Sequence, residues 1–122
     1  MLYKPQHFSI NEFVCKCGCD VVRVSAALVL FLDLLRKACG SPIVVSSGYR
    51  CSSHNSAVGG AARSRHMIGC AADIQGVSYS DVCNFAFGLT DVEIREYKTF
   101  VHFAVARDCV ARLWDGGFFR WL

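Results

Sequence analysis

Two histidines and one aspartate are the residues of this sequence whose types and spacing best suit metal chemistry. His66 and Asp73 lie seven residues apart, joined mostly by small residues and a glycine, and His102 lies in a short apolar segment further along the chain. A catalytic zinc site commonly has three protein ligands and a fourth position for water. A short spacer between two ligands, with the third on a distant strand, can assemble such a site. His66, Asp73 and His102 are therefore the candidate zinc ligands.

The same three residues can also be explained without a metal. A single histidine in a strand is often a core residue whose ring is satisfied by a backbone carbonyl. An aspartate at the position of Asp73 could simply close a turn. Spacing alone leaves both interpretations open.

The segments that must position these residues mix helices and strands. Ser25 is a suitable N-cap, apolar residues follow it at spacings of three and four, and Gly40 with Pro42 ends the pattern, which predicts a helix over 25–38. The stretch 48–69 indicates a long functional loop with one short helix near 52–57. The remaining predicted elements are a helix over 80–88 and strands over 43–47, 71–74 and 100–105. Without a regular alternation of strand and helix, the expected class is α+β in a single domain over 1–122.

Composition limits the class of protein. The chain has 122 residues, 53% of them hydrophobic and 19% charged, which excludes a disordered chain. The net charge of +3 includes no long run of one sign, so nucleic acid is not expected as the main partner. The most apolar stretch, 26–32, is far shorter than the roughly 20 residues of a membrane-spanning helix, and the start lacks the apolar region of a signal peptide. We expect a monomer made in the cytoplasm, without a membrane partner.

A ten-residue motif carries a resemblance to a known family. The pattern Ser-x-His-x-x-Gly-x-Ala-x-Asp is filled at every fixed position by Ser64, His66, Gly69, Ala71 and Asp73. It resembles the signature of the zinc D-Ala-D-Ala peptidases of family M15. Further segments are similar to its short bacterial and phage members, namely 7–13, 47–50, 54–55, 59–60 and 100–102. The resemblance runs from about residue 7 to residue 107.

The resemblance implies a fold, a metal and a reaction. The implied fold is a small antiparallel sheet with flanking helices, shared with Hedgehog-type signalling domains, and the implied zinc ligands are His66, Asp73 and His102. Water activated by the zinc would attack a peptide carbonyl of peptidoglycan. Arg50 stands where the family has an arginine that holds the substrate or its developing oxyanion, a task that suits a planar guanidinium. A surface ion pair is the alternative role for Arg50.

The general base is the least defined part of the predicted site. A zinc peptidase needs a carboxylate to take a proton from water, but Thr99 and Ala104 stand where family members often carry an acidic residue. Glu96 is the candidate base, because its offset from His102 resembles that of the glutamate of Hedgehog-type domains. Six residues of straight strand span about 20 Å, so the intervening chain would have to turn back. The same loop holds two further candidates, Glu93 and Asp91.

Two functions of different classes follow. The leading one is a zinc peptidase of the D,D-carboxypeptidase or endopeptidase type that acts on the cell wall, as a phage lysis protein or a virion component. The alternative is a catalytically inactive, zinc-stabilised domain that binds peptidoglycan or forms part of a virion. The absence of carboxylates at Thr99 and Ala104 motivates this alternative.

Eight cysteines are many for a chain of this length. Cys15, Cys17 and Cys19 alternate, so in an extended segment their thiols would point one way and could form part of a second zinc site. Cys51 is a conceivable fourth ligand, and free thiols in a tight turn are the alternative. Four cysteines with apolar neighbours are expected in the core, namely Cys39, Cys70, Cys83 and Cys109. The aromatic tail over 114–122 is expected either to pack back or to form an interface.

Overall fold

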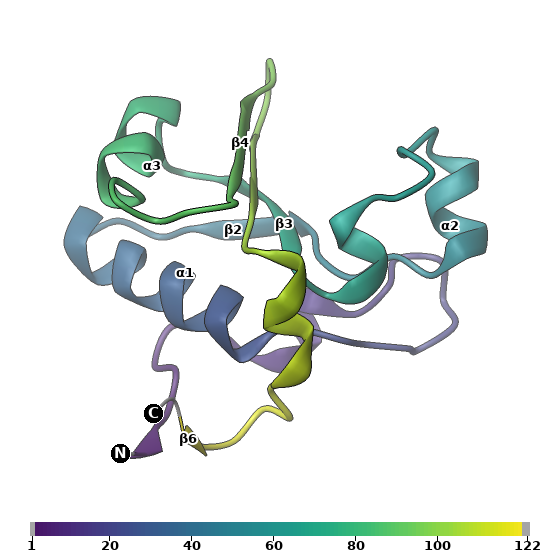
Figure 1. Cartoon of the computed structure of the whole chain (residues 1–122), viewed down its shortest axis with the longest axis horizontal. Coiled ribbons are helices and arrows are strands. Elements are labelled where there is room, and N and C mark those ends of the chain that lie inside the picture. Colours follow the sequence, from purple (N-terminus) through teal and green to yellow (C-terminus); the bar gives the residue numbers. More distant parts are fainter. Residues whose placement is uncertain (1, 121–122) are drawn as a thin grey trace.

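A four-stranded antiparallel sheet forms the centre of the computed structural model, which describes residues 2–120 (Figure 1). Its strands lie in the order β2 (Val44–Ser47), β3 (Ala71–Gln75), β5 (Val101–Ala104) and β4 (Glu93–Glu96). The α-helices are α1 (Ala26–Cys39), α2 (Ser52–Ala57) and α3 (Tyr79–Phe85), and the short 3₁₀ turns are η1 (Ile10–Phe13), η2 (Arg65–Ile68) and η3 (Arg107–Ala111). A second, two-stranded sheet pairs β1 (Leu2–Tyr3) with β6 (Phe119–Arg120). The predicted α+β class is confirmed.

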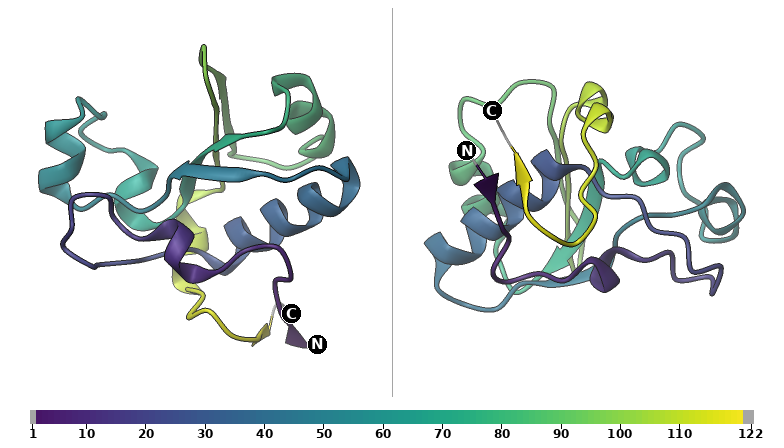
Figure 2. Two further views of the ribbon diagram at one scale, coloured as in Figure 1. Left: turned by 180° about the vertical axis from the view of Figure 1, so that it is seen from behind. Right: turned by 90° about the horizontal axis from the view of Figure 1, so that it is seen from below.

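Helix α1 runs along one side of the central sheet (Figures 1 and 2). The Ser25 hydroxyl accepts the backbone N–H of Ala27 at 3.1 Å, and the helix ends at Cys39, one residue beyond the predicted boundary. Phe31 of α1 stacks on Phe103 of β5 with ring centroids 3.9 Å apart. No helix within residues 2–120 is long and apolar enough to cross a membrane.

The pairing of β3 with β5 gives the sheet two different faces. Because side chains alternate along a strand, the paired residues Ala72 and Phe103 project to one side, whereas the paired residues Asp73 and His102 project to the other. The first face is the apolar one that packs against α1. The opposite face carries the polar side chains of the candidate site.

Strand β4 and helix α3 differ from the sequence-based prediction. Residues 93–96, expected in a loop, form the edge strand β4, which pairs with β5 in a hairpin. Helix α3 starts at Tyr79, one residue earlier than predicted, because the Ser78 hydroxyl caps it by accepting the backbone N–H of Asp81 at 3.1 Å. The helix also ends at Phe85, three residues short of the predicted boundary.

Two aromatic residues of the described part of the tail, Trp114 and Phe119, pack back on the rest of the molecule, whereas Phe118 is exposed. The buried Trp114 ring meets Phe13 edge-on, with centroids 6.3 Å apart, and Phe119 contacts Tyr3 with centroids 5.6 Å apart. Trp121 and Leu122, which belong to the predicted aromatic tail, lie outside the described residues.

The four cysteines predicted in the core differ in burial. Cys70 is fully buried, and Cys39 and Cys109 are half-buried against the core. Cys83 is half-buried and does not belong to the core cluster of described residues, so its predicted core position is wrong. The reason is that α3 buries Val82, and the next residue of a helix points to a different side.

Candidate metal centre

Asp73 lies between the two histidines that the sequence singled out. Its Oδ1 atom is 3.2 Å from Nε2 of His66 and 3.1 Å from Nδ1 of His102. Potential ligand atoms of the three residues all lie within 4.8 Å of one another. The side chains are buried, and the imidazole centroids are 5.2 Å apart. The structure therefore brings together His66, Asp73 and His102 as predicted.

The short segment before β3 explains how His66 and Asp73 meet. The Ser64 hydroxyl caps η2 by accepting the backbone N–H of His66 at 3.2 Å. Gly69 ends η2 with φ 79°, and a Cβ at this position would lie 2.5 Å from the carbonyl oxygen of Arg23. Only glycine tolerates both this backbone conformation and this close approach. The chain can therefore turn from η2 into β3 and direct both side chains to one point.

A backbone carbonyl fixes the ring of His66. Its Nδ1 atom lies 2.7 Å from the carbonyl oxygen of Gly48, so Nε2 faces Asp73. Gly48 itself lies against Phe13, where a Cβ would be only 2.7 Å from the Phe13 Cα atom. Such an outer hydrogen bond sets the orientation and tautomer of a histidine ligand. This carbonyl satisfies one ring nitrogen of His66 and leaves the other directed at Asp73. His102, the histidine in a strand, has carboxylate oxygens next to both ring nitrogens, so the interpretation of a core histidine satisfied by a backbone carbonyl does not describe it.

The charge state of Asp73 suits a metal ligand. Burial alone would raise the pKa of Asp73, but hydrogen bonds from His102 and His66 lower it to about 2. Burial would lower the pKa of His102, yet hydrogen bonds to Asp73 and Glu93 raise it above its ordinary value. Asp73 is therefore an ionised carboxylate at neutral pH, as a metal ligand must be.

Two nitrogens and one carboxylate oxygen form a donor set that zinc accepts. Tetrahedral nitrogen and oxygen ligands at about 2.0–2.1 Å from zinc are about 3.3 Å apart. The separations from Asp73 Oδ1 to the two imidazole nitrogens, 3.2 and 3.1 Å, are close to this value. His66, Asp73 and His102 therefore fit a zinc ion, the metal that the sequence predicts.

Arg50 contacts the second oxygen of the central carboxylate. Its Nη2 atom donates to Asp73 Oδ2 at 3.1 Å, while Nε donates to Ser47 at 3.1 Å and Nη1 to Asn55 at 3.3 Å. The Arg50 side chain is only 14% exposed, so the alternative of a loose surface ion pair does not describe it. The structure thus brings Arg50 to the metal centre.

Asn55 is a site residue that sequence reasoning did not assign. It is buried, holds Arg50 and donates to the carbonyl oxygen of Ala61 at 2.9 Å. The contact of Asn55 with Arg50 joins α2 to the centre. In the sequence, the only signal for Asn55 is its place in a segment that resembles the family.

The three candidate bases have different positions. Glu93 Oε1 lies 3.0 Å from Nε2 of His102, and its Oε2 lies 3.4 Å from Nε of Arg65. Asp91 is held by Arg65, with Nη2 to Oδ1 at 3.1 Å, and its side chain is 63% exposed. Burial would raise the pKa of Glu93, but hydrogen bonding to His102 and the charge of Arg65 lower it. Glu93 is therefore the ionised carboxylate that reaches the centre.

Glu96 does not come to the centre. In the β4–β5 hairpin Arg95 pairs with His102 and Glu96 pairs with Val101, which projects to the α1 side of the sheet. The chain does turn back at 97–100, where the Tyr97 N–H donates to the Phe100 carbonyl at 3.0 Å, but the register puts Glu96 on the wrong face. A direct proton transfer by Glu96 at this centre does not fit the structure.

A cleft of about 330 Å³ opens at the centre. Three arginines line it, Arg50, Arg63 and Arg95, together with the aromatic rings of Tyr97 and Phe100. Guanidinium groups suit an anionic ligand such as a carboxylate. The cleft is therefore fit for a small anionic or C-terminal group next to the metal ligands.

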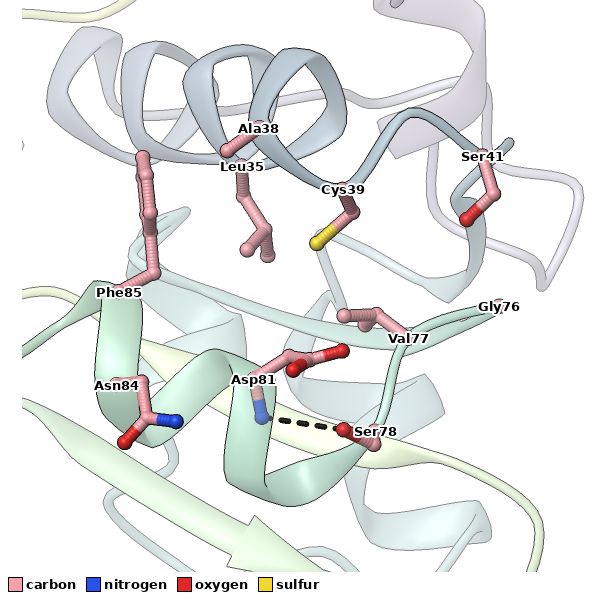
Figure 3. Close-up of a pocket in the computed structure, with 10 residues that line it drawn as sticks. All are labelled: Leu35, Ala38, Cys39, Ser41, Gly76, Val77, Ser78, Asp81, Asn84 and Phe85. Atoms are coloured by element: carbon pink, nitrogen blue, oxygen red, sulfur yellow. Dashed lines mark hydrogen bonds between the residues drawn. The ribbon is translucent and has the colours of Figure 1, made fainter.

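A larger hollow of about 650 Å³ lies elsewhere, between α1 and α3 (Figure 3). Its wall includes Leu35, Cys39 and Phe85, and the hydrogen bond from Asp81 to Ser78 lies at its edge (Figure 3). Among the described residues that line it, Asp81 is the only acidic one and none is a histidine. This hollow lacks the groups that the metal centre gathers.

Comparison with known proteins places this chain in a family of peptidases. The sequence model of the family described as peptidase M15 matches residues 6–104, most of the chain. The chain belongs to the peptidase M15 family, and the resemblance seen in the sequence is confirmed.

A similar curated protein is the zinc D-Ala-D-Ala carboxypeptidase of Streptomyces albus G. The two are 43% identical over 61 residues, which amount to 48% of this chain and 24% of that protein. This chain thus spans about a quarter of the length of the curated relative it matches.

Proposed function

We propose that this protein is a zinc-dependent peptidase that hydrolyses peptide bonds of bacterial peptidoglycan, as a D,D-carboxypeptidase or an endopeptidase. The observation that carries the proposal is the position of Asp73, held between His66 and His102 on one oxygen and by Arg50 on the other. The name of the relative from Streptomyces albus G supports both the metal and the D-Ala-D-Ala chemistry. Action on the cell wall, in lysis or in a virion, is part of this proposal.

The three predicted ligands would hold the zinc. When bound, zinc supplies Lewis-acid polarisation of a carbonyl and lowers the pKa of water towards neutrality. Asp73 contributes the negative charge that offsets the cation, and Gly48 keeps His66 in the orientation that binding requires. His102 is oriented in the same way by Glu93 on its other nitrogen.

Arg50 and its neighbours would bind the substrate. Its guanidinium lies at the wall of the cleft, next to Asp73, and is fixed by Ser47 and Asn55. A fixed cation at this place can stabilise the negative charge that develops on a carbonyl oxygen. Arg63 and Arg95 line the same cleft and suit the terminal carboxylate of a peptide.

Glu93 replaces Glu96 as the proposed general base. Among Glu93, Glu96 and Asp91, it is the one that lines the cleft. Its lowered pKa keeps it ionised, ready to take a proton from water and pass it to the leaving amine. Its bond to His102 also gives it a positioning role.

Digestion of purified muropeptides, read by mass, tests the proposal and identifies the bond. Loss of one terminal alanine from a pentapeptide identifies a carboxypeptidase, whereas separation of cross-linked dimers identifies an endopeptidase. A zinc-loaded protein that leaves every muropeptide intact contradicts the proposal.

A second candidate function is recognition of wall peptides without turnover. It is supported by Thr99 and Ala104, which lack carboxylates, and by the engagement of Glu93 with Arg65 and His102. Under this candidate, the protein binds muropeptides and zinc but releases no product, and Glu93→Gln changes neither binding nor zinc content.

A further inference from the structure

Four cysteine thiols converge in a second cluster, apart from the metal centre. Cys15, Cys17 and Cys19 belong to the loop between η1 and α1, and Cys51 is the residue that caps α2. Their four sulfur atoms all lie within 4.8 Å of one another. None of the four forms a disulfide. Residues more than thirty positions apart are thus gathered around one point.

The separations between sulfur atoms match a tetrahedral metal site. Sγ of Cys17 lies 3.5 Å from Sγ of Cys15 and 3.7 Å from Sγ of Cys51. Thiolates about 2.3 Å from zinc in a tetrahedron are about 3.8 Å apart. Sulfur atoms in a disulfide are only about 2.05 Å apart. The observed distances are therefore close to those of shared metal ligands.

Two backbone N–H groups already point at these sulfurs. The N–H of Cys51 donates to Sγ of Cys15 at 3.4 Å, and the N–H of His54 donates to Sγ of Cys51 at 3.4 Å. Bonds of this kind favour the negative charge that a thiolate ligand carries. Cys15 is buried, whereas Cys17 and Cys19 are exposed, so a cation can enter from solvent and be fixed from the inner side.

We propose that Cys15, Cys17, Cys19 and Cys51 bind a second zinc ion in a structural site. Four soft thiolates with no position left for water are typical of structural zinc rather than catalytic zinc. This site is independent of the peptidase centre, which contains no sulfur ligand.

The position of this cluster defines what the second zinc stabilises. Cys51 directly follows Arg50, which contacts Asp73 at 3.1 Å. On the other side, the loop begins just after Phe13, whose carbonyl accepts the N–H of Tyr49 at 2.9 Å. The zinc ties the loop over 15–19 to the start of α2, and it thereby holds the segment that carries Arg50.

Cobalt spectroscopy of the reduced full chain tests the proposal. Tetrahedral Co²⁺ bound to thiolates gives strong sulfur-to-metal absorption in the near ultraviolet, which two histidines and an aspartate cannot give. We expect the wild type to bind two equivalents of zinc and, when loaded with Co²⁺, to show this absorption. His66→Ala should lower the zinc content towards one equivalent and keep the absorption.

Two matched variants, each with two thiols removed, sharpen the test. C17S/C19S should bind one equivalent of zinc and lose the sulfur absorption, whereas C39S/C83S should behave like the wild type. If C17S/C19S does not fold, the wild-type spectrum decides by itself. A reduced wild type that binds one zinc without sulfur absorption, or a Cys17–Cys51 disulfide that persists under reductant, overturns the proposal.

Discussion

At the scale of the residue, Asp73 is the point where all parts of the centre meet. One of its oxygens contacts both histidines, and the other contacts Arg50. The local motif predicts that His66 and Asp73 are near each other, because only a short turn separates them. The contact with Arg50 could not be derived from spacing, since it depends on the pairing of β2 with β3.

Asp73→Asn removes the charge but keeps the shape of this residue. We expect the zinc affinity of the His66 centre to fall by more than about 100-fold, because an amide oxygen offsets the cation poorly. Competition with a chelator measures the affinity. Asp81→Asn, a matched change outside the centre, should leave it unaltered; equal losses in both variants contradict the assignment.

The stability of the metal-free protein should depend on pH through the same carboxylate. The folded pKa of Asp73 is about 2, below its ordinary value of 3.8. Its stabilising contribution is therefore complete above about pH 4 and lost as the pH falls through about 2. The shift corresponds to about 2 kcal/mol. Urea unfolding at several pH values should show this loss in the wild type and not in Asp73→Asn, and parallel curves for the two proteins would disprove it.

At the scale of the element, the β4–β5 hairpin decides which acidic residue can act. The sequence of β4 is mostly charged, and it lies at the edge of the sheet, so sequence patterns did not distinguish it from a loop. Because side chains alternate along the paired strand, Glu93 and Arg95 lie on the same face of the sheet as His102, and Glu96 lies on the other face. Helix α1 was predictable by contrast, because its cap and its apolar spacing are local.

Glu93→Gln and Glu96→Gln form a matched pair that tests this register. We expect Glu93→Gln to slow muropeptide cleavage by about 100-fold or more with zinc retained, because an amide cannot accept the proton. Glu96→Gln should change the rate less than about threefold. The cleavage rate is measured from the mass of the products, and the zinc content is measured by metal analysis. An equal loss of cleavage rate in both variants contradicts the assignment of Glu93 as the base.

The turn from η2 into β3 offers a second matched pair. Gly69 and Gly59 have similar positive φ angles, 79° and 73°, but a Cβ at Gly69 meets the Arg23 carbonyl at 2.5 Å, whereas nothing lies within 4 Å at Gly59. Gly59→Ala should cost about 1 kcal/mol from the backbone alone. Gly69→Ala should cost at least about 2 kcal/mol more, measured by urea unfolding. Similar losses for the two variants rule out the close approach as the reason for glycine.

At the scale of the whole molecule, contacts between residues distant in sequence hold together the fold that carries the metal centre. The family motif predicts the ligands of this centre but not these contacts. The fully buried Asp33 of α1 accepts the Tyr3 hydroxyl and the backbone N–H groups of Gln6 and His7, which fastens the start of the chain to the helix. Trp114 packs on Phe13 from the other end of the chain. Such contacts join residues distant in sequence, so the sequence predicted the zinc ligands and offered Glu93 and Cys51 only as candidates among alternatives. The contact of Asn55 with Arg50 had no such prediction.

The central claim is that zinc held by His66, Asp73 and His102 drives hydrolysis of peptidoglycan peptides. Its most direct test is to strip the wild-type protein and His66→Ala of metal, restore zinc stepwise and follow muropeptide cleavage by mass in both proteins. We predict that the metal-free wild type releases no product, that added zinc restores its cleavage, and that His66→Ala stays inactive at every zinc concentration. Full zinc occupancy with no product at any step contradicts it.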